Sequence, residues 1–106
     1  MAEVKELTEE TFDAAVSTGV AVVDFWATWC GPCKMMGALL DGQIAPALDA
    51  SVTVGKVNID AQTDLAVRFA VQSVPTLLIF KDGEERARLT GLQKPQEVID
   101  AVRAVL

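Results

Sequence analysis

The sequence predicts an α/β fold in which strands and helices alternate around a mixed sheet, in the order β-α-β-α-β-α-β-β-α. Val20–Ala27 is a nearly continuous apolar run, as in a central strand that is covered on both faces. Strand-like and helix-like patterns alternate around it, which favours parallel strands joined by right-handed crossovers. Asp82-Gly83 predicts a tight hairpin, which adds an antiparallel strand at the edge of the sheet.

The N-terminal segment is expected to add a short strand and the first helix. Val4–Leu7 has a weak strand pattern, and Thr8 is a suitable N-cap for a helix that Ser17-Thr18-Gly19 ends. Leu7 and Phe12 have the spacing of a hydrophobic staple, which fixes how the chain enters such a helix.

Residues 33 to about 50 predict a second helix, because apolar residues recur near one face. Gly42 and Pro46 interrupt this pattern. An interior proline removes a backbone hydrogen bond and clashes with the preceding turn, so we expect a kink or break there.

The C-terminal half continues the alternation and ends in the hairpin and a last helix. The expected elements are a strand at Val52–Ile59, a helix at Asp60–Ala70, strands at Val74–Phe80 and Glu85–Thr90, and a helix that begins near Pro95. Proline suits the first turn of a helix. The apolar stripe of this last helix is expected to consist of Val98, Ile99, Val102, Val105 and Leu106.

Composition and charge limit the kind of protein that this is. The 106 residues fit one domain, expected to span 1–106, and 51% of them are hydrophobic, enough for one core. A net charge of −6 disfavours nucleic acid as a partner. The N-terminus has no secretory-signal pattern, and no apolar stretch approaches the roughly 20 residues that span a bilayer. We therefore expect a cytoplasmic monomer without membrane association.

The only two cysteines, Cys30 and Cys33, form a CxxC pair between the apolar strand and the second helix. Disulfide exchange requires a thiolate, which the free N–H groups and the positive end of a helix stabilise. We expect Cys30, nearer solvent, to be the nucleophile, and Cys33 to be the resolving thiol that breaks a mixed disulfide. Gly31-Pro32 restricts the backbone between them and eases closure of the small ring.

Two alternatives for this pair are a zinc site and a structural disulfide. A structural zinc needs four ligands, and the sequence contains no further cysteine and no histidine. A disulfide that closes so short a loop contributes little stability. In a reducing cytosol a CxxC pair favours redox or metal chemistry over a structural role, so we expect redox chemistry and no bound metal.

Asp24 is the one charged residue of the apolar strand, six positions before Cys30. A buried carboxylate must find a partner or raise its pKa, and a raised pKa suits an acceptor for the proton of Cys33. Lys56, on the next predicted strand, is a candidate charge partner. The alternative is that Asp24 lies at an edge of the sheet and is solvated.

Pro75, Trp26 and Trp29 each allow a structural interpretation. Pro75 precedes a strand, a common place for proline, and the pattern alone does not favour a cis peptide bond. Tryptophans in and after a strand usually belong to the core, although Trp29, next to Cys30, can instead form a contact surface.

Asp24–Lys34, which contains Trp-Cys-Gly-Pro-Cys, closely resembles the active-site stretch of the thioredoxin family. The similarity continues in order through Val57–Asp60, Val74–Leu77, Phe80–Gly83 and Gly91, and it covers nearly the whole chain. A bare CxxC is a weak motif, whereas this series of matches is specific. The resemblance implies the thioredoxin fold, a central mixed sheet of five strands flanked by four helices.

The resemblance also implies a function and roles for individual residues. It implies a protein-disulfide reductase whose Cys30–Cys33 disulfide cycles with a dithiol, with thioredoxin reductase as its electron donor and no bound cofactor. It makes Asp24 buried and functional beside Lys56, and Pro75 cis and packed against the cysteines. The implied docking surface for an extended segment of a substrate protein consists of Trp29, Gly31, Pro32, Val74, Pro75 and Gly91.

One region departs from the family pattern. Thioredoxins usually carry a kinking proline about one turn after the second cysteine, where this chain has Ala38, preceded by Gly37. The stretch from Cys33 to Asn58 is also slightly longer than usual. We expect the helix to be continuous through its first half and broken near Gly42–Pro46.

Two other functions stay open at this point. Oxidases and isomerases of the same fold typically have histidine between the cysteines, where this chain has Gly31-Pro32, the reducing variant. A non-catalytic binding subunit would instead use the active-site face only as a docking surface.

Overall fold

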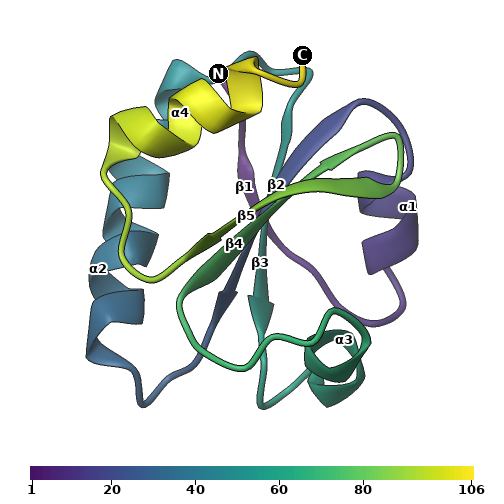
Figure 1. Ribbon diagram of the computed structural model, residues 1–106, viewed down its shortest axis with the longest axis vertical. Coiled ribbons are helices and arrows are strands. Elements are labelled where there is room, and N and C mark those ends of the chain that lie inside the picture. The colour runs from purple at the N-terminus through teal and green to yellow at the C-terminus, as the bar shows by residue number, and fades with distance from the viewer.

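The computed structural model describes residues 1–106 and has a five-stranded sheet with helices on both of its faces (Figure 1). The strands are β1 (Val4–Glu6), β2 (Val20–Trp26), β3 (Thr53–Asn58), β4 (Thr76–Lys81) and β5 (Glu84–Thr90). The α-helices are α1 (Phe12–Val16), α2 (Gly31–Leu39), α3 (Thr63–Arg68) and α4 (Pro95–Arg103). The predicted mixed sheet with four helices is therefore confirmed, in the predicted order.

The strands lie in the order β1-β3-β2-β4-β5, so β2 is at the centre of the sheet. β3 pairs in parallel with β1 and β2, whereas β4 pairs antiparallel with β2 and with β5. Asp82 and Gly83 connect β4 to β5, and both have positive φ angles, of 51° and 85°. The hairpin that this dipeptide predicts is confirmed.

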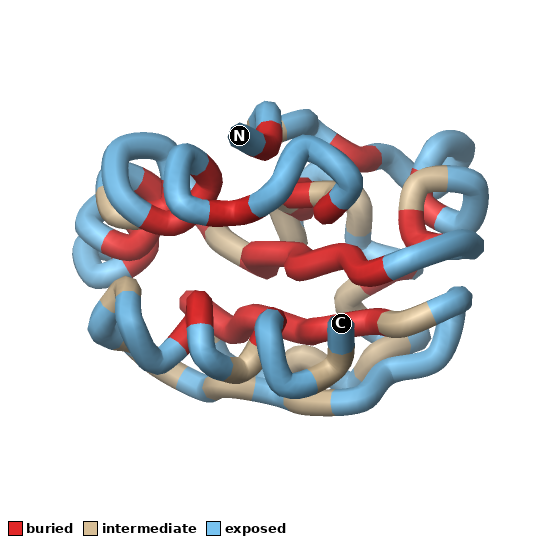
Figure 2. The backbone as a smooth tube through the Cα atoms, turned by 90° about the horizontal axis from the view of Figure 1, so that it is seen from above, coloured by how far each residue is buried: buried red, intermediate tan, exposed pale blue.

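Two hydrophobic cores lie on opposite faces of the sheet. On one face α2 and α4 cover Val20 and Val22, and on the other α1 and α3 cover Ala21, Val23 and Phe25 (Figure 1). Alternate residues of β2 thus enter different cores, which explains why its sequence is almost continuously apolar. Figure 2 shows the buried backbone concentrated in the central strands, with exposed residues around them.

The helix that follows the cysteines is α-helical only as far as α2 extends. It then widens into a π turn, Leu40–Ile44, in which the Ala45 N–H bonds to the Leu40 carbonyl. A short 3₁₀ turn, Ala45–Ala47, follows, and Pro46 lies in its first turn, where a proline N–H is not required. The predicted break in this helix is therefore confirmed.

The first helix begins later than predicted. The Thr8 N–H donates to the Thr11 hydroxyl at 2.9 Å, and the two hydroxyls lie 3.2 Å apart. Thr8 Oγ1 also accepts from the Thr11 N–H at 3.3 Å, so Thr8 caps a turn that leads into α1, while the regular α-helix starts only at Phe12. Leu7 and Phe12 are both buried in the same core, as the staple spacing predicts.

The end of the last helix also differs from expectation. Val98, Ile99 and Val102 are buried, but Leu106 is 61% exposed, so its predicted place in the apolar stripe is wrong. The reason is that α4 ends at Arg103, after which the chain no longer keeps the helical period. None of the helices combines the length and the apolar character that a membrane crossing requires.

Candidate active site

The two cysteines lie where β2 ends and α2 begins. Cys30 and Cys33 form a disulfide across the first turn of α2, with their Cα atoms 5.3 Å apart. Cys30 is the N-cap, and its Sγ accepts a hydrogen bond from the Cys33 N–H at 3.1 Å. Pro32 lies in the first turn, where its missing N–H leaves no bond unmade. The start of the helix thus directs a backbone donor at a sulfur that can carry negative charge.

The two sulfurs differ more in their surroundings than in their exposure. Cys30 is 6% exposed and Cys33 is 3% exposed, so the difference has the predicted direction but is small. Cys30 Sγ lies 3.7 Å from the Val74 carbonyl oxygen, on the side where the α3–β4 segment approaches. Cys33 instead lines a groove of about 440 Å³ beside α2, together with Lys56.

The segment between α3 and β4 packs against the disulfide. The Val74–Pro75 peptide bond is cis and Pro75 is buried, as the resemblance implied and the local pattern alone did not favour. The Gly91 N–H donates to the Pro75 carbonyl at 2.8 Å, whereas the Val74 N–H donates no hydrogen bond within the chain. The structure therefore brings Val74, Pro75 and Gly91 together beside the cysteines.

Trp29 forms the exposed rim of the site. Its side chain is 69% exposed, and its Nε1–H donates to Asp60 Oδ2 at 2.9 Å, which fixes the ring beside the disulfide. Gly31 and Pro32 are also exposed, so these three residues form a surface next to Cys30. Sequence reasoning assigned no role to Asp60, although it ends a stretch in which the family resemblance is strong.

Asp24 is buried in the centre of the sheet. It has no exposed surface, and neither carboxylate oxygen has a hydrogen-bond partner. The alternative that Asp24 lies solvated at a sheet edge is therefore wrong. Burial raises the pKa of Asp24 from 3.8 to about 7, while the Lys56 ammonium acts in the opposite direction. A carboxyl group with this pKa exchanges its proton at neutral pH.

Lys56 lies beside Asp24 without forming an ion pair with it. The two residues are register partners on β3 and β2, but the Lys56 Nζ lies over the Trp26 ring, 5.1 Å from its centroid. Gly37 of α2 leaves room for this ammonium group, because a Cβ there would stand 3.3 Å from Nζ. Lys56 therefore acts on Asp24 through its charge, as a neighbour rather than as a bonded partner.

Comparison with known proteins decides the family of this chain. The model of the thioredoxin family matches residues 3–104, which include the cysteine pair, the cis proline and Gly91. The chain belongs to the thioredoxin family. Its sheet order, its helices and the position of the CxxC pair are those of the thioredoxin fold.

Curated relatives and solved structures agree with this assignment. The chain is 40% identical to a thioredoxin of Staphylococcus saprophyticus over 102 residues, 96% of each chain. It is 44% identical to a thioredoxin of Chlamydia pneumoniae over 90 residues, which cover 85% of this chain and 86% of the relative. The crystal structure of a Malassezia sympodialis thioredoxin superposes with a TM-score of 0.86 at 30% identity and covers 99% of this chain and 92% of its own. A mutant thioredoxin from Halobacterium salinarum superposes with a TM-score of 0.89 at 30% sequence identity. The match covers 97% of this chain and 90% of that protein.

The family and the cysteine geometry together define the chemistry. A thioredoxin with a CxxC pair joined as a disulfide at the start of a helix is a protein thiol-disulfide oxidoreductase, and Cys30 and Cys33 are the redox pair.

Proposed function

We propose that the chain, as a single thioredoxin domain spanning 1–106, reduces disulfide bonds of protein substrates in the cytoplasm. The observation that carries this proposal is the Cys30–Cys33 disulfide at the N-terminus of α2, held in a family of thiol-disulfide oxidoreductases. The dithiol form of Cys30 and Cys33 reduces the substrate disulfide, and the Cys30–Cys33 disulfide is the oxidised form that results. Gly31-Pro32 between the cysteines, without histidine, supports reduction as the working direction.

The reaction proceeds in two exchanges, both proposed for these atoms. The Cys30 thiolate attacks one sulfur of the substrate disulfide, the S–S bond breaks, and the departing sulfur leaves as a thiolate that takes up a proton. Cys33, as its thiolate, then attacks Cys30 Sγ and releases the second substrate sulfur. Two electrons pass from the cysteine pair to the substrate. The Cys33 N–H, 3.1 Å from Cys30 Sγ, supports Cys30 as the sulfur that is stabilised as an anion.

Asp24 is proposed as the group that accepts the proton of Cys33. A thiol must lose its proton before it attacks, and a carboxylate with a pKa of about 7 takes up that proton at neutral pH. The groove beside α2 is lined by Cys33 and by Lys56, the register partner of Asp24, and it would bring water to Cys33, although Asp24 itself is buried and does not line it. Lys56 favours the charged form of Asp24 and so keeps part of it ready to act as a base.

Substrates are proposed to dock as an extended segment on the surface beside Cys30. The free Val74 N–H supports backbone pairing, because it donates no hydrogen bond within the chain. Trp29, Gly31 and Pro32 on one side, and Pro75 and Gly91 on the other, would contact the residues that flank the substrate disulfide. This surface binds main chain and apolar groups, which suits many different protein substrates.

The electron donor is proposed to be a thioredoxin reductase, a separate flavoprotein, and the protein is proposed to act as a monomer. The net charge of −6 supports a protein that binds neither nucleic acid nor anionic membranes.

The direct test is reduction of insulin by the dithiol form, followed through the precipitation of the reduced chains. We expect the parent protein to be active and Cys30→Ser to be inactive, because the serine hydroxyl does not form a mixed disulfide. Cys33→Ser is expected to stop after one exchange and to remain covalently attached to its substrate. If the fully reduced parent left insulin intact, the reductase proposal would fail and a binding subunit would remain as the explanation for the docking surface.

A further inference from the structure

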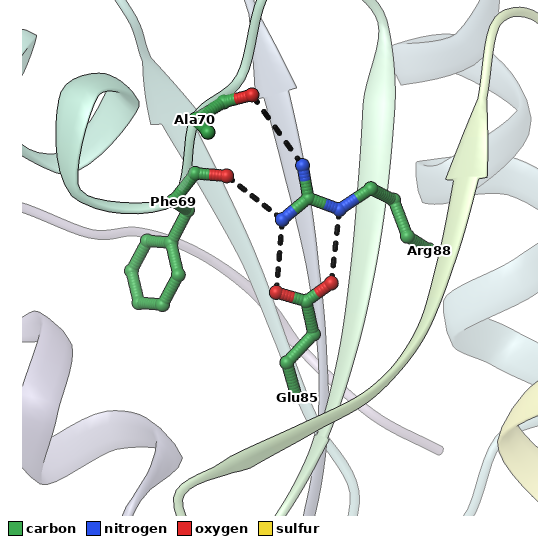
Figure 3. Close-up of polar contacts among 4 residues, drawn as sticks. All are labelled: Phe69, Ala70, Glu85 and Arg88. Carbon is green, nitrogen blue, oxygen red and sulfur yellow. Dashed lines mark hydrogen bonds and ion pairs between the residues drawn. The ribbon is translucent and has the colours of Figure 1, made fainter.

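Arg88 on β5 joins the end of α3 to Glu85 (Figure 3). Its Nη2 donates to the Phe69 carbonyl at 2.7 Å, and Nη1 donates to the Ala70 carbonyl at 3.5 Å. Nε and Nη2 each donate to one carboxylate oxygen of Glu85, both at 2.9 Å. The last carbonyls of a helix have no partner within the helix, so Arg88 supplies donors that the end of α3 lacks. Every nitrogen of the guanidinium group is thus engaged.

A β-bulge is what allows Glu85 to reach Arg88. Residues three apart on a regular strand point to opposite faces of the sheet. Between β4 and β5, however, the register shifts and leaves Arg86 without a cross-strand partner. Glu85 and Arg88 consequently pair with Phe80 and Leu78, which face the same core, under α3. The extra residue, Arg86, places Glu85 and Arg88 on the same face of β5, where they form a bidentate ion pair.

The segment that follows α3 is held at one end by β5 and at the other by Gly91, the residue after β5. At its start, Arg88 bonds to the carbonyl of Ala70, whose φ of 52° marks the sharp turn out of the helix. At its other end, the Gly91 N–H bonds to the Pro75 carbonyl at 2.8 Å. Val74, whose carbonyl faces Cys30, lies between these two attachments.

We propose that Arg88, oriented by Glu85, is a positioning residue for substrate docking. By holding the end of α3 it fixes the direction in which the chain leaves that helix, and so it holds the Val74 backbone where a substrate segment pairs with it. This inference rests on the docking role of Val74 in the proposed function. Arg88 contacts neither cysteine, so it governs the binding of protein substrates and leaves the chemistry of the thiols unchanged.

The test compares Arg88→Ala with Arg86→Ala, both as reduced dithiols. Each variant removes one positive charge from β5, but the Arg86 side chain forms no ion pair within the chain and serves as the matched control. Two substrates are used: insulin, which must dock as a chain, and dithiobis-nitrobenzoate, a small disulfide that needs no docking segment. We expect Arg88→Ala to lower kcat/KM for insulin by about three- to tenfold, mainly through KM, and to leave the rate with the small disulfide unchanged. Arg86→Ala should match the parent in both assays.

A second variant guards against a folding defect in Arg88→Ala. Arg88→Lys keeps the charge but cannot form the fork to Glu85 and both carbonyl bonds, so its KM for insulin should lie between those of the parent and Arg88→Ala. Amide hydrogen exchange gives an independent reading. The N–H groups of Ala70 and Val71 bond to the carbonyls of Val67 and Ala66, and they should exchange faster in Arg88→Ala.

The outcomes separate this inference from the proposed function. Equal values of kcat/KM for insulin in Arg88→Ala and Arg86→Ala would overturn the positioning role. An equal loss with both disulfides would overturn it too, because the effect would then lie at the cysteines. Failure of the parent itself to reduce insulin is a different result, which removes the proposed function together with the inference that rests on it.

Discussion

Asp24 and Lys56 stand directly opposite each other on the parallel strands β2 and β3, yet they form no ion pair. The ammonium group of Lys56 lies over the Trp26 ring, and both carboxylate oxygens of Asp24 are without a hydrogen-bond partner. The positive charge lowers the pKa of Asp24, but burial raises it by more, and the carboxyl group titrates at about pH 7. Four predictions follow from this site and the core behind it.

Asp24→Asn should stabilise the folded protein above neutral pH. The pKa of Asp24 is about 7 when folded and near 3.8 when exposed, so between these values the folded state keeps a proton that the unfolded state loses. The contribution of Asp24 to the free energy of unfolding of the parent therefore falls as the pH rises from about 4 to about 7 and is level above that. Asparagine does not ionise, so the variant does not lose this free energy of unfolding. At about pH 8 it should be more stable than the parent, by up to about 4 kcal/mol.

Urea unfolding at several pH values measures this difference. Glu10→Gln is the control, because Glu10 is exposed and does not affect Asp24, and it should follow the parent. A constant difference between Asp24→Asn and the parent from about pH 4 to about pH 8 would contradict the raised pKa.

Asp24→Asn should also slow the second exchange. Without a carboxylate to accept its proton, Cys33 attacks the mixed disulfide more slowly, and insulin reduction at about pH 7 should fall by about tenfold or more. The rate of the parent is expected to inflect near pH 7 as Asp24 titrates, and the variant should lack this inflection. Above about pH 9, where thiols ionise without help, the two proteins should approach the same rate. Matching profiles of parent and variant around neutral pH would rule out the proton-transfer role.

Lys56→Met and Asp41→Asn should move the pKa of Asp24 in opposite directions. Lys56 lowers this pKa and Asp41, which lines the same groove, raises it. Removing the positive charge should therefore shift the pKa above 7, and removing the negative charge should shift it below 7. An NMR titration of the Asp24 carboxyl carbon in the oxidised protein measures both shifts. Shifts of the same sign would show that the two groups act through structure rather than charge.

Gly55→Ala should destabilise the fold. Leu7 packs directly over Gly55 on β3, and a Cβ there would stand 2.8 Å from Leu7 Cγ, too close for the buried leucine to stay in place. Overpacking of this kind costs about 1–3 kcal/mol of the free energy of unfolding. Gly42→Ala is the control, because no atom lies within 4 Å of its Cβ position; in its helical turn this change should raise stability, by about 0.4–1 kcal/mol, rather than lower it.

The double variant Gly55→Ala/Leu7→Ala completes a cycle for this contact. If the clash is the cause, Leu7→Ala should cost less stability in the Gly55→Ala background than in the parent. Additive effects, measured by urea unfolding, would argue against it.

The parts of the fold set by hydrophobic burial were predictable from the sequence. The apolar pattern of Val20–Ala27 predicted a strand covered on both faces, and the charge inside it predicted that Asp24, if buried, would find a partner or have a raised pKa. The start of the regular helix α1 was not predicted, because Thr8 and Thr11 close a turn ahead of it and use the same residue types as a helix cap. Propensity alone does not separate these two turns.

Some parts of the candidate site were predictable from the residues alone, and others only from the family resemblance. The spacing of Cys30 and Cys33 indicated redox chemistry by itself, whereas the cis Pro75 and the role of Gly91 followed only from the family resemblance. The position of Lys56 over Trp26 depends on the space that Gly37 leaves, which no pattern along the chain displays.

The Glu85–Arg88 ion pair could not be predicted from the sequence, and the reason is geometric. Its spacing of three predicts opposite faces on a strand, and nothing in the sequence marks the bulge that reverses this. A face assigned by alternation holds only as far as the register is regular.

The π turn at Leu40–Ile44 keeps the helix in phase with the sheet over a length that an ideal helix would not sustain. Within the helical segment the buried residues Met36, Leu40 and Ile44 recur at every fourth position, and Leu48 follows where the backbone has become extended. On an α-helix a row of this spacing rotates by about 40° at each step, or about 80° from Met36 to Ile44, and so drifts away from the sheet. A turn with a wider hydrogen-bond ring holds more residues and offsets that rotation. The wider turn thereby keeps Ile44 in the same core as Met36 and Leu40, on the face of the sheet that α2 covers, before the helical segment ends at Ala47.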